Sequence, residues 1–144
     1  MSRIVPLPTT NTVVDNTVAI INADGSVASF AQVPSTASRI PSSANTTNAT
    51  SAKATAGALF SVNGYNSTAT VTYLKFYNKA TAPTVGTDTP VLTLALPASA
   101  AFSYNLGGIA FATGIGYGLT TVAADNGTTA PAAGAILGLN VVFS

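Results

Sequence analysis

Apolar and polar residues alternate along several short stretches in the second half of the chain. Successive side chains of a β-strand point to opposite faces, so alternate residues of such a stretch share one face. We therefore expect one set in each stretch to face a core. The expected inward-facing sets are Thr72, Leu74 and Phe76, and Leu92, Leu94 and Leu96.

From residue 49 onward, these stretches recur at intervals of roughly 8–12 residues with Gly, Pro or Asn at the breaks, which is typical of a sandwich or barrel. Helix is disfavoured because the chain has no Glu and many β-branched residues, Thr above all. The pattern predicts an all-β fold, with an antiparallel β-sandwich or jelly-roll-like domain over residues 49–144.

Glycines mark two places in this domain. Gly114, Gly116 and Gly118 alternate, so one face of that strand carries no side chains and should let a second layer approach closely. Gly107 and Gly108 follow an alternating run, and they predict a hairpin turn into residues 109–111.

Residues 1–48 predict an extended arm and linker. Pro6 and Pro8 favour an extended start, and residues 34–48 have no periodicity. Between these parts, an Asp-Gly turn at residues 24–25 predicts a small hairpin that folds residues 18–21 back onto residues 27–30.

An isolated hairpin is marginal in water, so this one should lie on the main domain, on a neighbouring subunit or on a partner. We expect contacts to come from the apolar residues of the arm and one cation. The candidate contact residues are Arg3, Ile4, Val5, Leu7, Val13, Val14, Val18, Ile20 and Ile21.

Charged residues make up 6% of the chain and the net charge is +1, whereas ordinary globular proteins carry about 25% charged residues. Such a surface must be solvated by Ser, Thr and Asn or covered by another protein. The five cations are dispersed, which argues against nucleic acid as a partner. No apolar run approaches the ~20 residues needed to cross a bilayer, and the N-terminus lacks a secretory h-region. We expect a protein made in the cytoplasm, without a membrane partner.

The absence of His and Cys removes the usual general base, thiol nucleophile and transition-metal ligands. Of the four Asp residues, Asp24, Asp88 and Asp125 lie in turn-like contexts, where a carboxylate typically caps backbone amides. We predict that the chain is not an enzyme and holds no cofactor or metal.

Tyrosines are the remaining candidates for recognition. Tyr65, Tyr73, Tyr77 and Tyr117 are candidates for oligomer or outer-face contacts. The alternative interpretations are half-buried core residues and a sugar-binding face on which the rings stack.

One long stretch resembles a known protein family. Residues 73–91 read YLKFYNKATAPTVGTDTPV, and LALP at 94–97 and GGIAFATGI at 107–115 follow. These sequence motifs resemble a module of small virion proteins of tailed bacteriophages, and the resemblance covers about residues 51–143.

The resemblance implies a capsid cement or decoration protein, often trimeric, that binds the major capsid protein on the head surface and clamps neighbouring capsomers. It places the protein in the virion. The alternative is a tail, baseplate or fibre component with a carbohydrate- or host-binding face.

Overall fold

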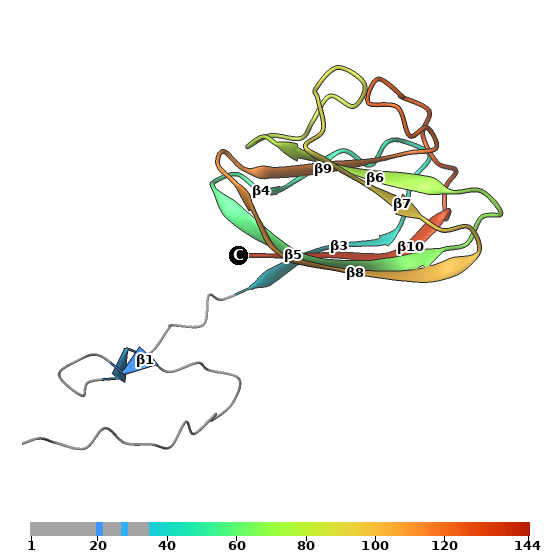
Figure 1. Ribbon diagram of the computed structural model, residues 1–144. Coiled ribbons are helices and arrows are strands. Elements are labelled where there is room, and N and C mark those ends of the chain that lie inside the picture. Colours follow the sequence, from blue (N-terminus) through green and yellow to red (C-terminus); the bar gives the residue numbers. More distant parts are fainter. Residues whose placement is uncertain (1–19, 22–26, 29–34) are drawn as a thin grey trace, which may run out of the picture. The chain divides into compact units, whose positions relative to one another are not determined.

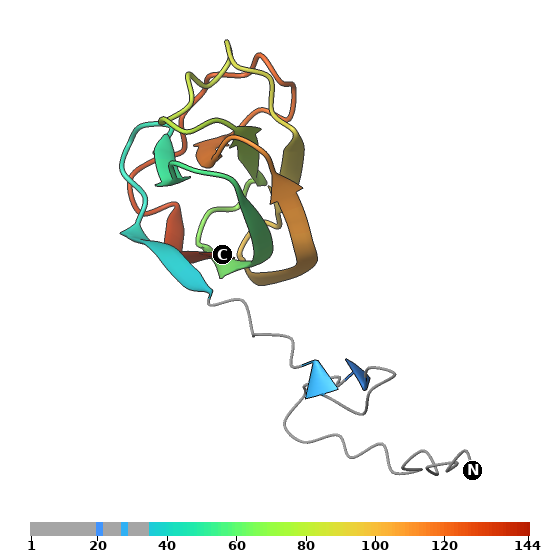
Figure 2. The same ribbon diagram turned by 90° about the vertical axis from the view of Figure 1, so that its left-hand side faces the viewer.

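The computed structural model describes residues 20–21, 27–28 and 35–144, and all regular structure in these residues is β. The chain divides into two units, Met1–Pro34 and Ser35–Ser144, which are described separately (Figure 2). The larger unit is a sandwich of two four-stranded sheets (Figure 1). Its strands are β3 (Thr36–Ser42), β4 (Thr50–Lys53), β5 (Gly57–Asn66), β6 (Thr72–Asn78), β7 (Leu92–Leu96), β8 (Ala100–Phe111), β9 (Ile115–Thr120) and β10 (Ile136–Phe143).

The sandwich is wound as a jelly roll. The strand orders are β3-β10-β5-β8 and β4-β9-β6-β7, and every pairing is antiparallel. The topology is that of one long hairpin, and the chain reverses between β6 and β7. The two halves of this hairpin pair with each other, β5 with β8, β4 with β9 and β3 with β10. Rolling this hairpin up brings β10 beside β5 and β9 beside β6, which makes the two sheets. The predicted all-β, antiparallel sandwich is confirmed.

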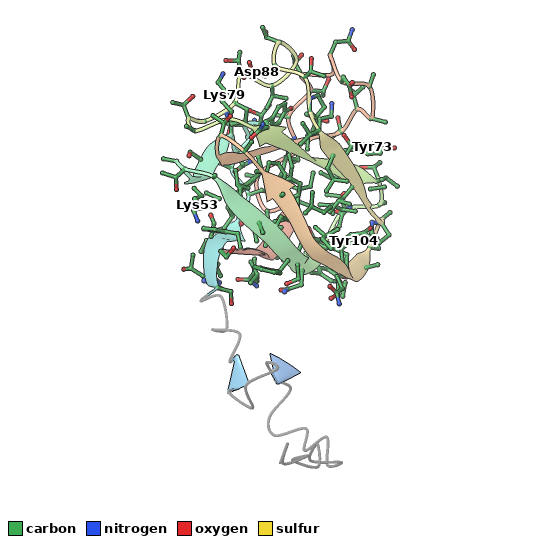
Figure 3. All side chains as sticks on the ribbon, turned by 60° about the vertical axis from the view of Figure 1, so that its left-hand side comes forward. Lys53, Tyr73, Lys79, Asp88 and Tyr104 are labelled. Carbon is green, nitrogen blue, oxygen red and sulfur yellow. The ribbon has the colours of Figure 1, made fainter. Side chains whose placement is uncertain are left out.

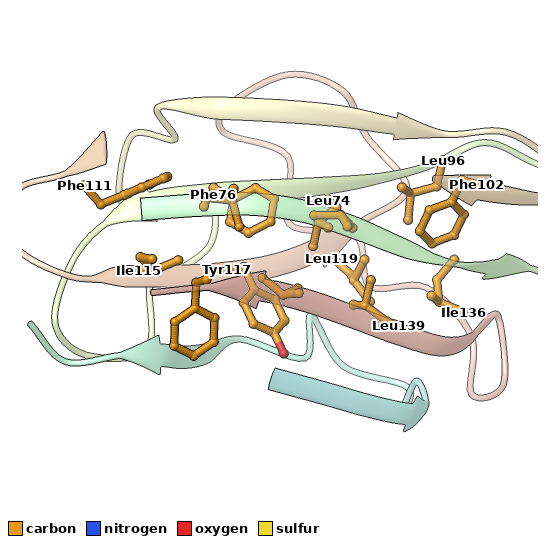
Figure 4. Packing of buried hydrophobic residues seen from close by; sticks show 14 residues of the cluster. Leu74, Phe76, Leu96, Phe102, Phe111, Ile115, Tyr117, Leu119, Ile136 and Leu139 are labelled. Atoms are coloured by element: carbon orange, nitrogen blue, oxygen red, sulfur yellow. The ribbon is translucent and has the colours of Figure 1, made fainter. Parts of the chain in front are cut away.

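The core lies between the sheets (Figure 4). Thr72, Leu74 and Phe76 are buried as the alternation predicted, and the ring of Phe76 packs against those of Phe111 and Tyr117 at centroid distances of 6.4 and 6.0 Å. Leu96 is buried too. Leu92 and Leu94 face the core but stay partly exposed, because β7 is an edge strand.

The predicted domain boundary at residue 48 differs from the structure. The compact unit begins at Ser35, and the predicted linker contributes β3, which pairs with β10 from Thr36 to Ser42. The strand was not predicted because it consists mainly of polar residues and contains Pro41. An edge strand with one solvent-exposed face needs few apolar residues. Ile40 is its contribution to the core.

The predicted turn at Gly107 and Gly108 is also wrong. Strand β8 continues through both glycines and pairs with β5 on either side of them, with a register shift opposite Phe60. Both glycines have positive φ (65° and 91°), which accommodates the extra residues of a bulge without reversing the chain.

In the smaller unit, the described residues are two short strands, β1 (Ile20–Ile21) and β2 (Val27–Ala28). They pair antiparallel, with Ile20 opposite Ala28 and Ile21 opposite Val27. This pairing confirms the predicted hairpin.

Candidate functional site

The two outer faces of the sandwich differ in what covers them. Loops of residues 79–91 and 121–135 lie over the β4-β9-β6-β7 sheet (Figure 1). The loops contact each other as well as the sheet: a Cβ on Gly86 would lie 2.3 Å from the Thr128 methyl carbon. The loops and the core therefore bury β9 and most of β6 on both faces, whereas Thr93 and Ala95 of the edge strand β7 stay exposed.

The alternating glycines of β9 allow the first loop to pack closely against the sheet. A Cβ on Gly118 would lie 2.6 Å from a methyl of Val85, and one on Gly116 would lie 3.1 Å from Cδ of Pro83. The side-chain-free face of β9 thus receives the first loop at close range. The predicted close approach is confirmed, and the second layer is a loop.

Polar side chains of β6 are buried under the same loops. Lys75 is fully buried, and its Nζ donates a hydrogen bond to the carbonyl of Ala124 in the second loop. Burial lowers the pKa of the Lys75 ammonium, while the nearby Asp125 carboxylate raises it by a smaller amount. Two residues further on, Tyr77 is 1% exposed and its hydroxyl has no hydrogen-bond partner among the described residues. Its pKa is raised, first by burial and then by Asp88 and Asp125.

The first loop is held by an ion pair. Lys79 Nζ lies 2.6 Å from Asp88 Oδ2, which also accepts a hydrogen bond from the backbone N–H of Thr84 (Figure 3). These hydrogen bonds, from Lys79 first and then Thr84, lower the pKa of Asp88. Asp88 therefore caps a turn as predicted. Asp125 lies in the turn that the Gly127 N–H to Ala124 carbonyl hydrogen bond closes.

The β3-β10-β5-β8 sheet has no such cover within residues 35–144. We call its outward-facing residues the open face. They form three rows across the strands, and Arg39 is the one charged residue among them. The rows are Leu137, Tyr65 and Ala101; Arg39, Asn140, Asn63 and Ser103; and Ala37, Val142, Ser61 and Asn105.

A bulge in β10 sets the composition of this face. The pairing with β5 shifts register between Leu137 and Asn140, at Gly138, whose φ is +57°. Because of the extra residue, Leu137 and Asn140 both face outward although they are three positions apart, and Leu139 between them is buried.

Tyr65 and Leu137 are the most exposed large apolar side chains in the three rows of the open face. They are direct cross-strand partners and are 42% and 38% exposed. In the next row, Asn140 Nδ2 donates a hydrogen bond of 2.9 Å to Asn63 Oδ1. The face therefore combines an exposed aromatic and aliphatic pair with amides, a composition typical of protein interfaces.

The structure separates the four predicted tyrosines. Tyr65 lies on the open face, and Tyr73 is half-buried on β6. Tyr77 and Tyr117 are buried inside the subunit, so the outer-face prediction is wrong for these two. Tyr117 faces the core and its hydroxyl lies 2.9 Å from Ser38 Oγ.

Most predicted contact residues of the arm lie outside the described residues. These are Arg3, Ile4, Val5, Leu7, Val13, Val14 and Val18. Ile20 and Ile21 form β1. Their proposed contacts with a partner stay predictions.

Sequence reasoning missed Leu137, Asn63 and Asn140 as components of a surface. Their rows depend on the β10 bulge and on pairing between segments about 75 positions apart in the sequence, and neither is visible in a local pattern. The signal that was available is Gly138, since a glycine inside a strand pattern often marks a bulge.

The part of the chain that the structure describes holds no group of three or more His, Cys, Asp or Glu residues placed to bind a metal ion, and no helix suited to span a bilayer.

Comparison of the chain with protein-family models, with curated proteins and with solved structures gave no match.

Proposed function

We propose that this chain is a non-enzymatic structural protein of a bacteriophage virion, a decoration protein that binds the major capsid protein on the head surface. The observation that carries the proposal is the asymmetry of the sandwich. On one outer face, the chain's own loops bury β9 and most of β6, and the other outer face exposes Tyr65 and Leu137 on a nearly uncharged sheet.

The physical argument concerns exposed surface. A domain that covers one sheet with its own loops has the means to cover apolar surface, so an uncovered aromatic and aliphatic pair is best explained by a partner. The partner surface should also be poor in charge, because burying unpaired charges against this face would be costly.

The N-terminal arm supplies the second half of the proposal. Its apolar runs, at residues 4–7, 13–14 and 18–21, would add strands or apolar contacts to neighbouring capsid subunits. The sandwich would associate around a closed symmetry axis, for which the family resemblance implies a trimer.

Copy number per virion tests the proposal first. Quantitative mass spectrometry of purified virions should find a simple integer ratio to the major capsid protein, with hundreds of copies per particle. Absence from the virion would overturn the proposal.

Capsid attachment tests the two surfaces. Deletion of residues 1–22 and, separately, the paired change Tyr65→Ser with Leu137→Ser should each reduce co-sedimentation with capsids at least tenfold. Val91→Ser is the matched control, because Val91 is 59% exposed but lies in a loop away from the open face. Attachment that survives all these changes would contradict the proposed contacts.

A tail or fibre component that binds carbohydrate is the second candidate. The observation in its favour is that exposed Tyr65 lies one row from the hydrogen-bonded amides of Asn63 and Asn140, since an aromatic ring can stack on a sugar while amides bind hydroxyls. A glycan array that shows binding by the full chain and its loss in Tyr65→Ala, with only a handful of copies per virion, would favour it.

A further inference from the structure

The four edge strands of the sandwich differ in how they are protected against pairing with another strand. Natural edges carry charges, prolines or short strands, because a free edge presents unpaired backbone groups. The edges are β3, β8, β4 and β7. Strand β3 has Arg39 and Pro41, β4 is four residues long and ends at Lys53, and β7 is five residues long between Pro90 and Pro97.

Strand β8 has none of these features. It is 12 residues long and contains no charged residue and no proline. Its only irregularity is the bulge at Gly107 and Gly108, so residues 100–106 form a regular edge of seven residues.

The core beside this edge is incompletely covered. Tyr104 and Leu106 face inward but are only partly buried, and so are Leu92 and Leu94 of β7. The hydroxyl of Tyr104 donates a hydrogen bond to the carbonyl of Ala95, which places the two edge strands on the same side of the sandwich. A strand added to β8 would therefore satisfy backbone groups and cover apolar side chains at once.

We propose that β8 is a self-association edge, which pairs antiparallel with β8 of a second copy of this chain around a two-fold axis at Ser103. Each Phe102 then lies opposite Tyr104 of the other copy, and each Ala101 lies opposite Asn105. The two β3-β10-β5-β8 sheets join into one continuous eight-stranded sheet.

The strand is self-complementary in this register. Phe102 and Tyr104 are both inward-facing, so the dimer contains two cross-strand aromatic pairs, which are among the favourable pairs in antiparallel sheets. Because residues 100–106 carry no charge, self-pairing brings no like charges together. The outward-facing Ala101, Ser103 and Asn105 are small or polar and leave room at the axis.

This inference does not depend on capsid binding, since it concerns only the assembly of the isolated chain. It departs from the proposed function in one respect, because it gives a two-fold dimer in place of the trimer that the resemblance implies. The open face remains uncovered in this dimer.

The test is the oligomeric state of the full chain, measured by sedimentation equilibrium over a range of concentrations. The wild type should dimerise. Ser103→Lys and Ser103→Asp alone should each be monomeric, because like charges would meet at the axis, and an equimolar mixture of the two should restore a heterodimer. Ser42→Lys is the matched control, because Ser42 is an exposed serine on the opposite edge strand, and this variant should dimerise like the wild type.

A second variant guards against a folding defect at residue 103. Ala101→Lys combined with Asn105→Asp in one chain would place two opposite-charge pairs across the axis and should tighten the dimer roughly two- to thirty-fold. A wild type that stays monomeric would overturn the inference, as would a trimer or any oligomer that Ser103→Lys leaves unchanged. Failure of the mixture to re-associate would overturn the two-fold register.

Discussion

At the scale of single residues, the sandwich contains two buried tyrosine hydroxyls in opposite situations. Tyr77 has no hydrogen-bond partner among the described residues, whereas Tyr117 is bonded to Ser38. A buried polar group without a partner has lost its hydration and gained nothing in exchange, and a paired one makes a small net contribution to stability.

This contrast predicts opposite effects of the same substitution. Tyr77→Phe should raise the free energy of unfolding by about 1 kcal/mol, and Tyr117→Phe should lower it by about 1 kcal/mol. Urea denaturation of both variants measures the difference, and each serves as the control for the other. Equal destabilisation by both changes would show that the Tyr77 hydroxyl is satisfied in solution.

Lys75 predicts a pH dependence. The pKa of its ammonium in the folded protein is lower than the ordinary value of 10.5, so between these two pH values the unfolded chain binds more protons, and stability should rise with pH. Tyr77 has the opposite sign, but only above its unfolded pKa of 10.0, so the slope is best measured below pH 10.0. Lys75→Met should abolish the slope and stabilise the protein by about 1 kcal/mol at neutral pH, since it removes a buried charge. Thermal unfolding from neutral to alkaline pH compares the two proteins, and parallel profiles would contradict this origin of the slope.

At the scale of elements, the loop cover depends on missing side chains at β9. A Cβ on Gly114 would lie 2.7 Å from Cα of Ala80 and 2.8 Å from the carbonyl oxygens of Lys53 and Lys79. These are backbone atoms, so they cannot move aside as the end of a flexible side chain would. Close contact of loop and strand is thus a property of backbone geometry.

Two glycine substitutions separate crowding from backbone strain. Gly114→Ala should destabilise the protein by about 3 kcal/mol through overpacking. Gly107→Ala should cost only about 1 kcal/mol, because its positive φ is strained but nothing lies within 4 Å of the added carbon. Chemical denaturation gives both values, and a mild effect at Gly114 would mean that the loop can shift.

At the scale of the whole molecule, the last strand closes the fold. Strand β10 lies between β3 and β5 in the centre of its sheet, and it contributes Ile136, Leu139, Val141 and Phe143 to the core. The core residues that the structure describes all lie within Ser35–Ser144.

Truncation at the two ends should therefore have opposite outcomes. Removal of residues 136–144 should abolish cooperative unfolding, because two strands lose a neighbour and the core loses four large side chains. Removal of residues 1–34 should leave a folded sandwich with a similar midpoint of unfolding. Circular dichroism and limited proteolysis distinguish the two, and a folded protein without β10 would contradict the central role of that strand.

The sequence by itself determined the class of fold and the inward face of its clearest strands. Alternation at Thr72, Leu74 and Phe76 is a local property, and so is the Asp-Gly turn that pairs β1 with β2. The glycines of β9 predicted a close approach of a second layer, because a strand face without side chains is also a local property of the sequence.

Tertiary structure alone decided the rest. It placed residues 36–42 at a sheet edge and the two glycines of β8 in a bulge. It also buried Lys75, Tyr77 and Tyr117, because alternation shows which residues share a face but not how deeply that face is buried. It also assembled the open face and left β8 as an unprotected edge. Each of these outcomes depends on which distant segment lies alongside, and pairings such as β3 with β10 join residues about 100 positions apart, beyond the reach of any local pattern.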